Sequence, residues 1–464
     1  MKMVKSLILG TAAAFAATAA AQAADLPVKA KPVGYVKICP QYGPGFYYIP
    51  GTDICIKVGG LATMEFGIRN GNQTTEAPIS SNGNGANLVI NREDNDYMAR
   101  SRIYLILDTR QATPYGVLRT YVRQPFGVST SPNGNVNGTG LATATAGAEL
   151  AFLQFAGFTV GQTDSFFTFG NNYNGIGMAS VHWTWTQVVA YTANFGGGLS
   201  ATISLEDPSS TRYGIVNAAY ITASPGGAPA PSTIGIGDVS AGFRMPNVVG
   251  NVRIDQAWGS AQIMGAVTEL EVNGNTFAGG LLPAGVYPNS NGYAIGAGIV
   301  VNLPFIAPGD TISIQGVYSE GAVEYTGLGG NPLRNGPGFG FRQQTGAVGG
   351  PAFTAADAVT TATGIERTEA WSINGQFRHF FSPALRVAVF AGYTEVNFGT
   401  SATAQGYPSA EITQIGGNIA WSPVKDLNIQ LDVLWTDMST SATALQAAGS
   451  DDILAFRVNV NRPF

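Results

Sequence analysis

The last nine residues of the chain, 456–464, read FRVNVNRPF. Every second position, counted back from the end, falls on one side of the segment, and the residues between fall on the other. The first side consists of Phe464, Arg462, Val460, Val458 and Phe456. Alternation with a period of two is the pattern of a β-strand. Soluble proteins usually end in polar, frayed residues. An aromatic terminus within a strand therefore indicates either a buried edge strand or a strand that faces lipid.

The overall composition disfavours an ordinary soluble enzyme. Charged residues make up 11% of the chain and glycine supplies 61 of 464 positions, whereas soluble domains carry about 25% charged residues. A helix that spans a membrane needs about 18 uninterrupted apolar residues. The longest candidate, AIGAGIVVNLPFIA at 294–307, is interrupted by Asn302 and Pro304. A helical membrane protein is therefore disfavoured as well.

Residues 1–23 have the pattern of a secretory signal peptide. Lys2 and Lys5 precede an apolar stretch of small residues, and Ala-Gln-Ala at 21–23 resembles a cleavage site. Removal of this segment takes away two lysines and changes the formal charge from −5 to −7. We therefore expect an exported, mildly acidic protein.

Cys39 and Cys55 are the only cysteines, and both follow the export signal. An oxidising compartment would join them, and a ring of this size contributes about 3 kcal/mol in the chain-entropy model. We expect a disulfide-stapled segment over residues 24–56. Two free thiols are the alternative. A metal site is disfavoured because neither His182 nor His379 lies nearby.

From residue 57 onward the chain alternates in short segments of about ten residues. In LNIQLDVLWTDM (427–438), five apolar residues alternate with Asn, Gln and Asp. Two of the connections, FFSPALRV and AWSPVKDLNI, are short and place proline after serine, which suits a tight turn. Other connections are long, of low complexity, and lie at 70–96, 208–234, 326–365 and 439–451. Short turns at one end and long loops at the other are typical of a membrane β-barrel.

The alternating segments number about sixteen. A barrel of sixteen tilted strands is wide enough for a water-filled channel, and closure satisfies every backbone group within lipid. We predict an all-β fold, a membrane-spanning antiparallel β-barrel over residues 57–464 with one loop folded into the lumen. A secreted β-solenoid would need a fixed repeat, and the sequence has none. The expected strand starts lie near residues 58, 97, 116, 148, 159, 184, 198, 247, 260, 292, 311, 367, 385, 410, 427 and 452.

Several stretches resemble the alphaproteobacterial porin family over essentially the whole mature chain. They include YGPGFYYIPGTDICIKVGG (42–60), LQFAGFTVGQTDSFF (153–167), NVVGNVRIDQAWGSAQ (247–262) and the terminal strand. The resemblance implies an outer-membrane, sixteen-stranded homotrimeric channel for small hydrophilic solutes, surrounded by lipid and without a cofactor. It also implies that Phe464 is part of the signal read by the barrel-assembly machinery. A structural or adhesive barrel without an open channel is the alternative.

Four arginines flank one predicted turn. Arg100 and Arg102 precede it, Arg119 and Arg123 follow it, and all four alternate with apolar residues, so they are expected to face the lumen. Antiparallel pairing about the turn brings Arg102 and Arg123 to similar heights, where like charges crowd together. A charged constriction selects ions, and a guanidinium stays protonated. Alternatively, these arginines line a wide lumen and pair with local acids such as Asp108.

A porin of this kind folds its third loop inward. The candidate loop, FFTFGNNYNGIGMASVHW (166–183), carries no acid between Asp164 and Glu206. This departs from the usual acidic loop and weakens the expected field across the pore. Asparagines also form ordinary turns, so their presence alone leaves both interpretations open. The predicted constriction is lined by Asn171, Asn172 and Asn174, with Asp164 at its edge.

No catalytic, metal-binding or nucleic-acid-binding pattern is present. The two histidines stand alone, and there is neither a Gly-x-Ser-x-Gly motif nor a phosphate-binding loop. Ion selectivity should follow the field at the narrowest point, because distant loop charges are screened beyond about 8 Å. We expect a locally positive constriction and weak anion selectivity or near neutrality. Acidic loops at 93–94 and 206–207 would favour cations if they lay at the mouth.

Overall fold

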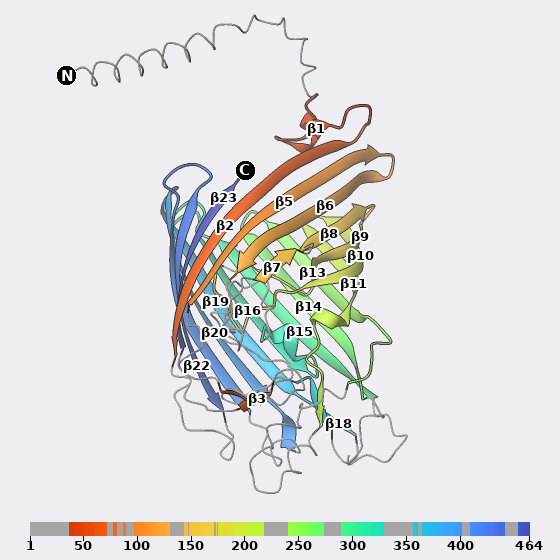
Figure 1. Cartoon of the computed structure of the whole chain (residues 1–464). Coiled ribbons are helices and arrows are strands. Elements are labelled where there is room, and N and C mark those ends of the chain that lie inside the picture. Colours follow the sequence, from red (N-terminus) through yellow and green to blue (C-terminus); the bar gives the residue numbers. More distant parts are fainter. Residues whose placement is uncertain are drawn as a thin grey trace, which may run out of the picture.

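The protein forms a closed antiparallel β-barrel, shown here by a computed structural model (Figure 1). The structure describes residues 37–71, 78–80, 87–89, 97–129, 143–146, 148–170, 173, 175–217, 240–272, 289–328, 356–360, 364–400, 409–440 and 453–464. No helix within these residues is long and apolar enough to cross a membrane.

Within these ranges, sixteen long strands form the ring, each antiparallel to the next along the chain. The last strand pairs with the first, Gly67 opposite Arg457, so the sheet has no free edge. The strands are β2 (Cys55–Gly71), β5 (Tyr97–Thr113), β6 (Gly116–Ser129), β8 (Leu150–Phe155), β9 (Phe158–Asp164), β10 (Trp185–Gly196), β11 (Leu199–Glu206), β13 (Asn247–Gln256), β14 (Gly259–Glu271), β15 (Asn289–Asn302), β16 (Thr311–Glu320), β19 (Glu369–Ser382), β20 (Leu385–Asn397), β21 (Ala410–Trp421), β22 (Asn428–Thr440) and β23 (Ile453–Pro463).

Smaller elements accompany the ring. β7 (Thr143–Ala146) pairs with β6 beside β8, and β1 (Tyr47–Tyr48) pairs with β2. Further short strands are β3 (Pro78–Ser80) with β4 (Asn87–Val89), and β12 (Ile215–Asn217) with β17 (Ala358–Thr360) and β18 (Ile365–Arg367). Three 3₁₀ turns are η2 (Pro40–Tyr42), η3 (Pro208–Ser210) and η4 (Val323–Thr326).

The predicted antiparallel β-barrel of about sixteen strands is confirmed, and every predicted strand start lies within three residues of an observed one. Alternation on β2 shows why. Met64, Phe66 and Ile68 are 52%, 46% and 57% exposed on the outer face, whereas Thr63 and Glu65 are buried on the inner face. An apolar outer surface suits hydrocarbon, and closure of the ring satisfies the backbone groups that lipid cannot.

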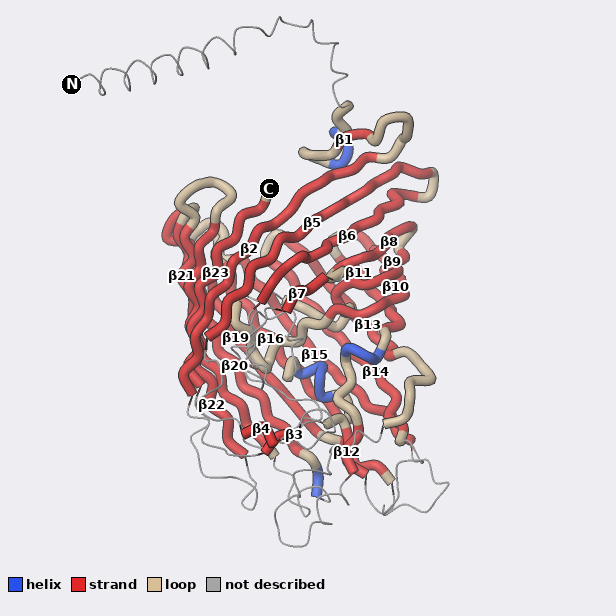
Figure 2. Tube along the Cα trace, viewed as in Figure 1, coloured by secondary structure: helices blue, strands red, loops and turns tan. Residues whose placement is uncertain are grey.

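The two ends of the barrel differ in the length of their connections. Short turns such as 114–115, 156–157 and 257–258 lie at the end where β2 begins and β23 finishes. Figure 2 shows this end near the C-terminus. At the opposite end of the strands, more residues separate one strand of the ring from the next, as between β2 and β5 or between β11 and β13. The predicted asymmetry is thus present, and the two ends are named here the short-turn end and the long-loop end.

The segment before β2 is stapled to the short-turn end. Cys39 and Cys55 form a disulfide, as predicted, with their Cα atoms 6.1 Å apart. Both cysteines are buried with Phe46, and the Arg110 guanidinium lies 4.8 Å from the centre of the Phe46 ring. The bridge and these contacts attach the segment to the first hairpin of the barrel. The predicted signal peptide, residues 1–23, lies outside the described residues.

The C-terminal residue closes the barrel at its seam. The Phe464 amide donates to the Gly60 carbonyl at 3.0 Å, and the Gly60 amide donates to the Phe464 carbonyl at 2.9 Å. A side chain at position 60 would clash with the Phe464 ring. That ring therefore lies on the outer face of the sheet, where it is 70% exposed in the isolated chain.

Candidate functional site

The segment between β9 and β10, of which the structure describes residues 165–170, 173 and 175–184, runs in this described part along the inner face of the barrel. Asn251 on β13 donates to the Phe166 carbonyl at 2.6 Å. Farther along, the Tyr173 amide donates to Gln376 on β19 at 2.9 Å, and Asn418 on β21 donates to the Tyr173 carbonyl at 2.7 Å. The segment thus crosses several strands before it returns to β10.

The turning point of this segment is also held by side chains of the wall. The Ala179 amide donates to Gln414 on β21 at 2.6 Å, and Thr394 on β20 donates to the Ala179 carbonyl at 3.0 Å. Asn374 on β19 donates to the Ser180 carbonyl at 2.7 Å. Backbone groups in a loop must find partners when they are buried, and the inward amides and hydroxyls of the strands provide them.

Apolar contacts add to these hydrogen bonds. Phe167 and Phe169 pack with inward residues of β13 to β16, including Val249 and Met264. Gly298 on β15 permits this approach, because a Cβ there would lie 2.5 Å from the Phe169 ring. A second cluster joins three residues of the segment to β20, β22 and β23 and consists of Ile176, Met178, Val181, Phe390, Leu434 and Ala455. One side of the interior is therefore packed and not open.

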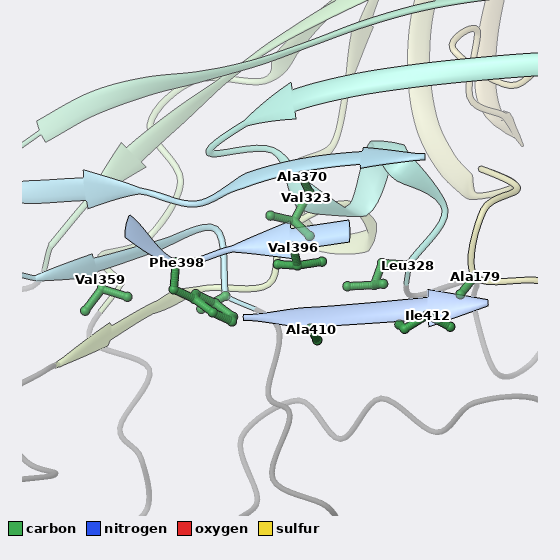
Figure 3. Close-up of a cluster of buried hydrophobic side chains, with 10 residues drawn as sticks. Ala179, Val323, Leu328, Val359, Ala370, Val396, Phe398, Ala410 and Ile412 are labelled. Carbon is green, nitrogen blue, oxygen red and sulfur yellow. The ribbon is translucent and has the colours of Figure 1, made fainter. Parts of the chain in front are cut away.

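The returning arm of the segment is fixed to η4. His182 is fully buried, and its Nε2 lies 3.1 Å from a carboxylate oxygen of Glu324. Thr184 donates its hydroxyl to the same carboxylate. Figure 3 shows Ala179 in the apolar cluster that also contains Val323 from η4. These contacts join the segment to the long-loop end.

The residues predicted to contribute to the constriction or to the mouth of the channel in this region have different outcomes. Asp164 lies at the end of β9 and accepts a 2.8 Å hydrogen bond from Trp183. Asn171, Asn172 and Asn174 lie outside the described residues. The alternative interpretation placed the acids 206–207 at the mouth of the channel. Glu206 lies at the end of β11, where it is fully buried and accepts a 2.9 Å hydrogen bond from the Phe166 amide of the inner segment. The other acidic pair, 93–94, is outside the described residues.

The four predicted arginines lie on the inner face of β5 and β6. Arg100 forms an ion pair with Glu65 on β2, and Arg102 lies 3.5 Å from the same carboxylate. Arg102 also lies 3.4 Å from Glu149, whose other oxygen is 2.8 Å from Arg123. Carboxylates between the guanidiniums therefore relieve the repulsion of like charges.

A further set of charges continues this pattern in both directions. Arg119 and its cross-strand neighbour Arg110 both bind Asp108, at 3.0 Å and 2.8 Å. On the other side, Arg457 from β23 bridges Glu65 and Asp432, at 2.9 Å and 3.0 Å. The result is a row of positive and negative side chains along the inner wall, here called the charge ladder. Its members are Glu65, Arg100, Arg102, Asp108, Arg110, Arg119, Arg123, Glu149, Asp432 and Arg457.

The prediction that Arg102 and Arg123 lie at similar heights on the barrel wall was wrong. Arg102 lies opposite Gly127, four residues from Arg123 on β6. Both side chains nevertheless reach Glu149 between them. Pairing with Asp108, the alternative interpretation, holds for Arg119.

Sequence reasoning did not identify the acids Glu65 and Glu149. Glu65 could have been noticed, because it is the single acid of its strand and alternates with outward Met64 and Phe66. Glu149 immediately precedes β8, where no pattern distinguishes it. No group of three or more His, Cys, Asp and Glu side chains in the described ranges could hold a metal ion.

Comparison with known proteins identifies the family. The family model described as the porin subfamily matches residues 25–457. The chain belongs to the porin subfamily. Its membership confirms the resemblance seen in the sequence, and together with the closed, outwardly apolar ring it places the chain in the bacterial outer membrane.

Curated relatives of this porin-subfamily chain come from Brucella. Porin Omp2b of Brucella melitensis biotype 1 is 29% identical over 267 residues, which cover 55% of this chain and 64% of the relative. Porin Omp2a of Brucella canis is 30% identical over 283 residues, covering 57% and 65%. The matches therefore span less than two thirds of the relatives' length.

Among solved structures, the outer membrane channel DcaP of Acinetobacter baumannii has a similar fold. The TM-score is 0.59 at 12% identity, with 90% of this chain and 99% of that chain covered. At this identity the likeness concerns the fold alone, and it agrees with the closed barrel described above.

Proposed function

We propose that this porin-subfamily chain forms a water-filled channel for passive diffusion of small hydrophilic solutes and ions. The charge ladder is the observation that carries the proposal. Ten charged side chains line one continuous part of the inner wall, and charges of this density are stable inside a barrel only when water or opposite charges accompany them. The curated relatives are named porins, which agrees with a transport role and not a catalytic one.

The channel is bounded on one side by the charge ladder and on the other by the 165–184 segment. We assign the constriction to Arg100, Arg102, Arg119 and Arg123, with Asp164 and the asparagines 171, 172 and 174 on the facing segment. The five arginines of β5 and β6 face the three acids Glu65, Asp108 and Glu149. This surplus of positive charge supports weak anion selectivity.

The remaining parts of the chain have roles in export and assembly. Residues 1–23 act as the cleaved signal peptide, residues 24–56 form the stapled module, and residues 57–464 form the barrel. Phe464 serves as part of the signal for the barrel-assembly machinery. Three copies associate through outward faces of the barrel, in contact with outer-membrane lipid. Chemical cross-linking of the protein in native membranes, followed by mass determination, tests the trimer.

The proposed channel is tested by adding purified, folded protein to a planar lipid bilayer. Stepwise increases in conductance are expected, because each inserted barrel adds one or more water-filled paths. Heat-denatured protein from the same preparation is the control. A bilayer that stays closed although folded barrels are present would contradict the proposal and favour a structural or adhesive barrel.

A further inference from the structure

A second pair of arginines lies on the inner wall and takes no part in the salt bridges of the charge ladder. Arg378 is on β19 and Arg386 is on β20, both near the short-turn end. Arg378 lies opposite Ala388, so Arg386 is its diagonal neighbour two positions along. Diagonal neighbours on one face of a sheet are separated by about 7–8 Å. Both guanidiniums can therefore reach the same small group in the lumen.

Neither arginine has a carboxylate partner among the residues that the structure describes. Arg378 donates to the Gly309 carbonyl at 3.2 Å, and Arg386 donates to the Gln430 side-chain carbonyl at 3.1 Å. Both acceptors are neutral. The Nε of Arg378 is buried and has no acceptor in the described structure, although a guanidinium offers five donors. This differs from the ladder, in which every arginine contacts an acid.

Two acids of the surrounding wall, Asp432 and Asp310, interact electrostatically with this pair but already accept hydrogen bonds from other donors. Asp432 accepts two hydrogen bonds from Arg457, at 3.1 and 3.0 Å, and one from Gln430 at 2.7 Å. Asp310 accepts from the His379 ring at 2.6 Å and from the Phe380 amide at 2.8 Å. Their charges reduce the local positive potential, but they leave the guanidinium edges of Arg378 and Arg386 available.

Aromatic rings hold one of these guanidiniums beside the inner segment. The centre of the Tyr173 ring lies 4.6 Å from the Arg378 guanidinium carbon, and that of Phe380 lies 5.3 Å away. Stacking on a ring orients the planar guanidinium and leaves its edges for hydrogen bonds. Because Tyr173 is held by Gln376 and Asn418, the pair adjoins a fixed part of the segment.

We propose that Arg378 and Arg386 form an anion-binding subsite for small solutes that carry a carboxylate or phosphate group. The inference rests on the proposed channel function and names a class of solute for it. Planar guanidiniums bind such oxyanions through paired, charge-assisted hydrogen bonds. An anion that enters the channel pauses at this pair, where it supplies the oxyanion partner that neither arginine has among the described residues.

The test uses single-channel recordings of the full-length mature protein in KCl. Sodium phosphate and sodium succinate are added in separate experiments at fixed pH and constant ionic strength. Phosphate or succinate bound at the subsite should obstruct chloride. The chloride current should therefore fall to a plateau as the concentration of the added anion rises. In the double variant Arg378→Gln with Arg386→Gln, the concentration for half-maximal obstruction should rise at least tenfold.

Arg253→Gln is the matched control. Arg253 also lies on the inner wall and contacts an aromatic ring of the segment, Phe169, but it is paired with Asp255 at 2.8 Å. Its replacement should change the half-maximal concentration by less than twofold. The single variant Arg386→Gln, which loses one contact to Gln430, provides the same test if the double variant does not fold.

The outcomes are distinguishable. Saturable obstruction by either anion that is lost in the arginine variants supports the subsite, and the effective anion shows whether carboxylate or phosphate is preferred. A native channel that conducts but shows no saturation, or an equal effect of Arg253→Gln, would overturn the subsite alone. A native protein that opens no channel would overturn the proposed function together with it.

Discussion

Gly60 and Phe464 meet at the seam where the first and last strands close the ring. Their backbones exchange hydrogen bonds in both directions, and the absence of a side chain at Gly60 leaves room for the terminal ring. An aromatic ring over a glycine covers backbone that would otherwise be bare. The final residue therefore completes both the hydrogen-bond ladder and the apolar outer surface.

Replacement of Phe464 by alanine should lower the yield of assembled barrel in the membrane several-fold. The backbone pairing would remain, but the terminal aromatic and its cover over Gly60 would be lost. The measurement is the fraction of heat-modifiable, folded protein on a gel. Phe305→Ala is the control, since Phe305 is an 80% exposed aromatic in a turn at the same end. Equal losses in both variants would show that any exposed aromatic at this end has the same role.

Asp357, in a connection at the long-loop end, gives the fold a dependence on pH. Its carboxylate accepts hydrogen bonds from the Tyr213 and Val323 amides at 2.8 and 2.9 Å. Burial raises the pKa of Asp357 to about 7 from an ordinary 3.8. Between these values the folded state binds the proton more tightly than the unfolded state, so stability falls as pH rises from about 4 to 7.

We therefore expect the amides of Tyr213 and Val323 to lose protection from hydrogen exchange between pH 4 and pH 8. Protection factors corrected for the intrinsic exchange rate measure this change. The Asp357→Asn variant has no titrating group at this position. The protection of the Tyr213 and Val323 amides from hydrogen exchange should therefore vary much less in this variant over the same pH range. An unchanged pH dependence in that variant would assign the effect to another group.

At the scale of elements, the 165–184 segment shows how a barrel wall can hold a chain inside it. The polar side chains of the inner face act as hydrogen-bond partners for backbone that has no strand of its own. Their replacement by apolar residues of similar size would leave buried backbone groups unsatisfied, which costs about 1–3 kcal/mol for each group.

Gln376→Leu combined with Asn418→Leu should loosen the segment at Tyr173. Without its two partners this backbone is free to leave the wall, so we expect larger and noisier single-channel conductance. Asn428→Leu is the control, because the Asn428 side chain faces inward and, among the described residues, donates to Ser422 in its own turn and not to the inner segment. Identical conductance in the double variant and the native protein would show that the apolar contacts of Phe167, Phe169 and Met178 suffice to hold it.

At the scale of the whole molecule, the formal net charge is negative, whereas the local group of charges on β5, β6 and their neighbours is positive. The predicted mature chain carries a formal charge of −7, whereas arginines outnumber acids along the hairpin of β5 and β6 and its neighbours. Fixed charges close to the path of an ion dominate its energy, because distant charges are screened within about 8 Å at physiological salt. We therefore expect selectivity to follow the charge ladder and not the total charge.

Arg102→Ala combined with Arg123→Ala should shift the reversal potential in a KCl gradient toward cation selectivity. The two substitutions remove both guanidiniums that contact Glu149 in the described structure, so its carboxylate becomes an exposed negative charge. A third substitution, Glu149→Gln, should reverse part of this shift in the reversal potential. Reversal potentials that do not move in the double variant would show that ions pass beyond the influence of this part of the ladder.

The sequence by itself determined the features that depend on neighbouring residues. Alternation at two-residue spacing identified the strands, their outward and inward faces and the inward position of Arg100, Arg102, Arg119 and Arg123, because successive side chains of a strand point to opposite faces. The connections between strands indicated the two ends, and the cysteines indicated the disulfide. Each of these inferences needs only the local geometry of the chain.

Only the tertiary structure decided which side chains meet. Arg457 and Glu65 are 392 positions apart and become partners because β23 closes on β2. Asn418 reaches the Tyr173 backbone across 245 positions because the segment crosses the barrel. Register and closure follow from the pairing of all sixteen strands together, and one step of register moves every inward side chain to the other face. The inward arginines of β5 and β6 were therefore evident in the sequence, whereas their acidic partners were set by the closed ring.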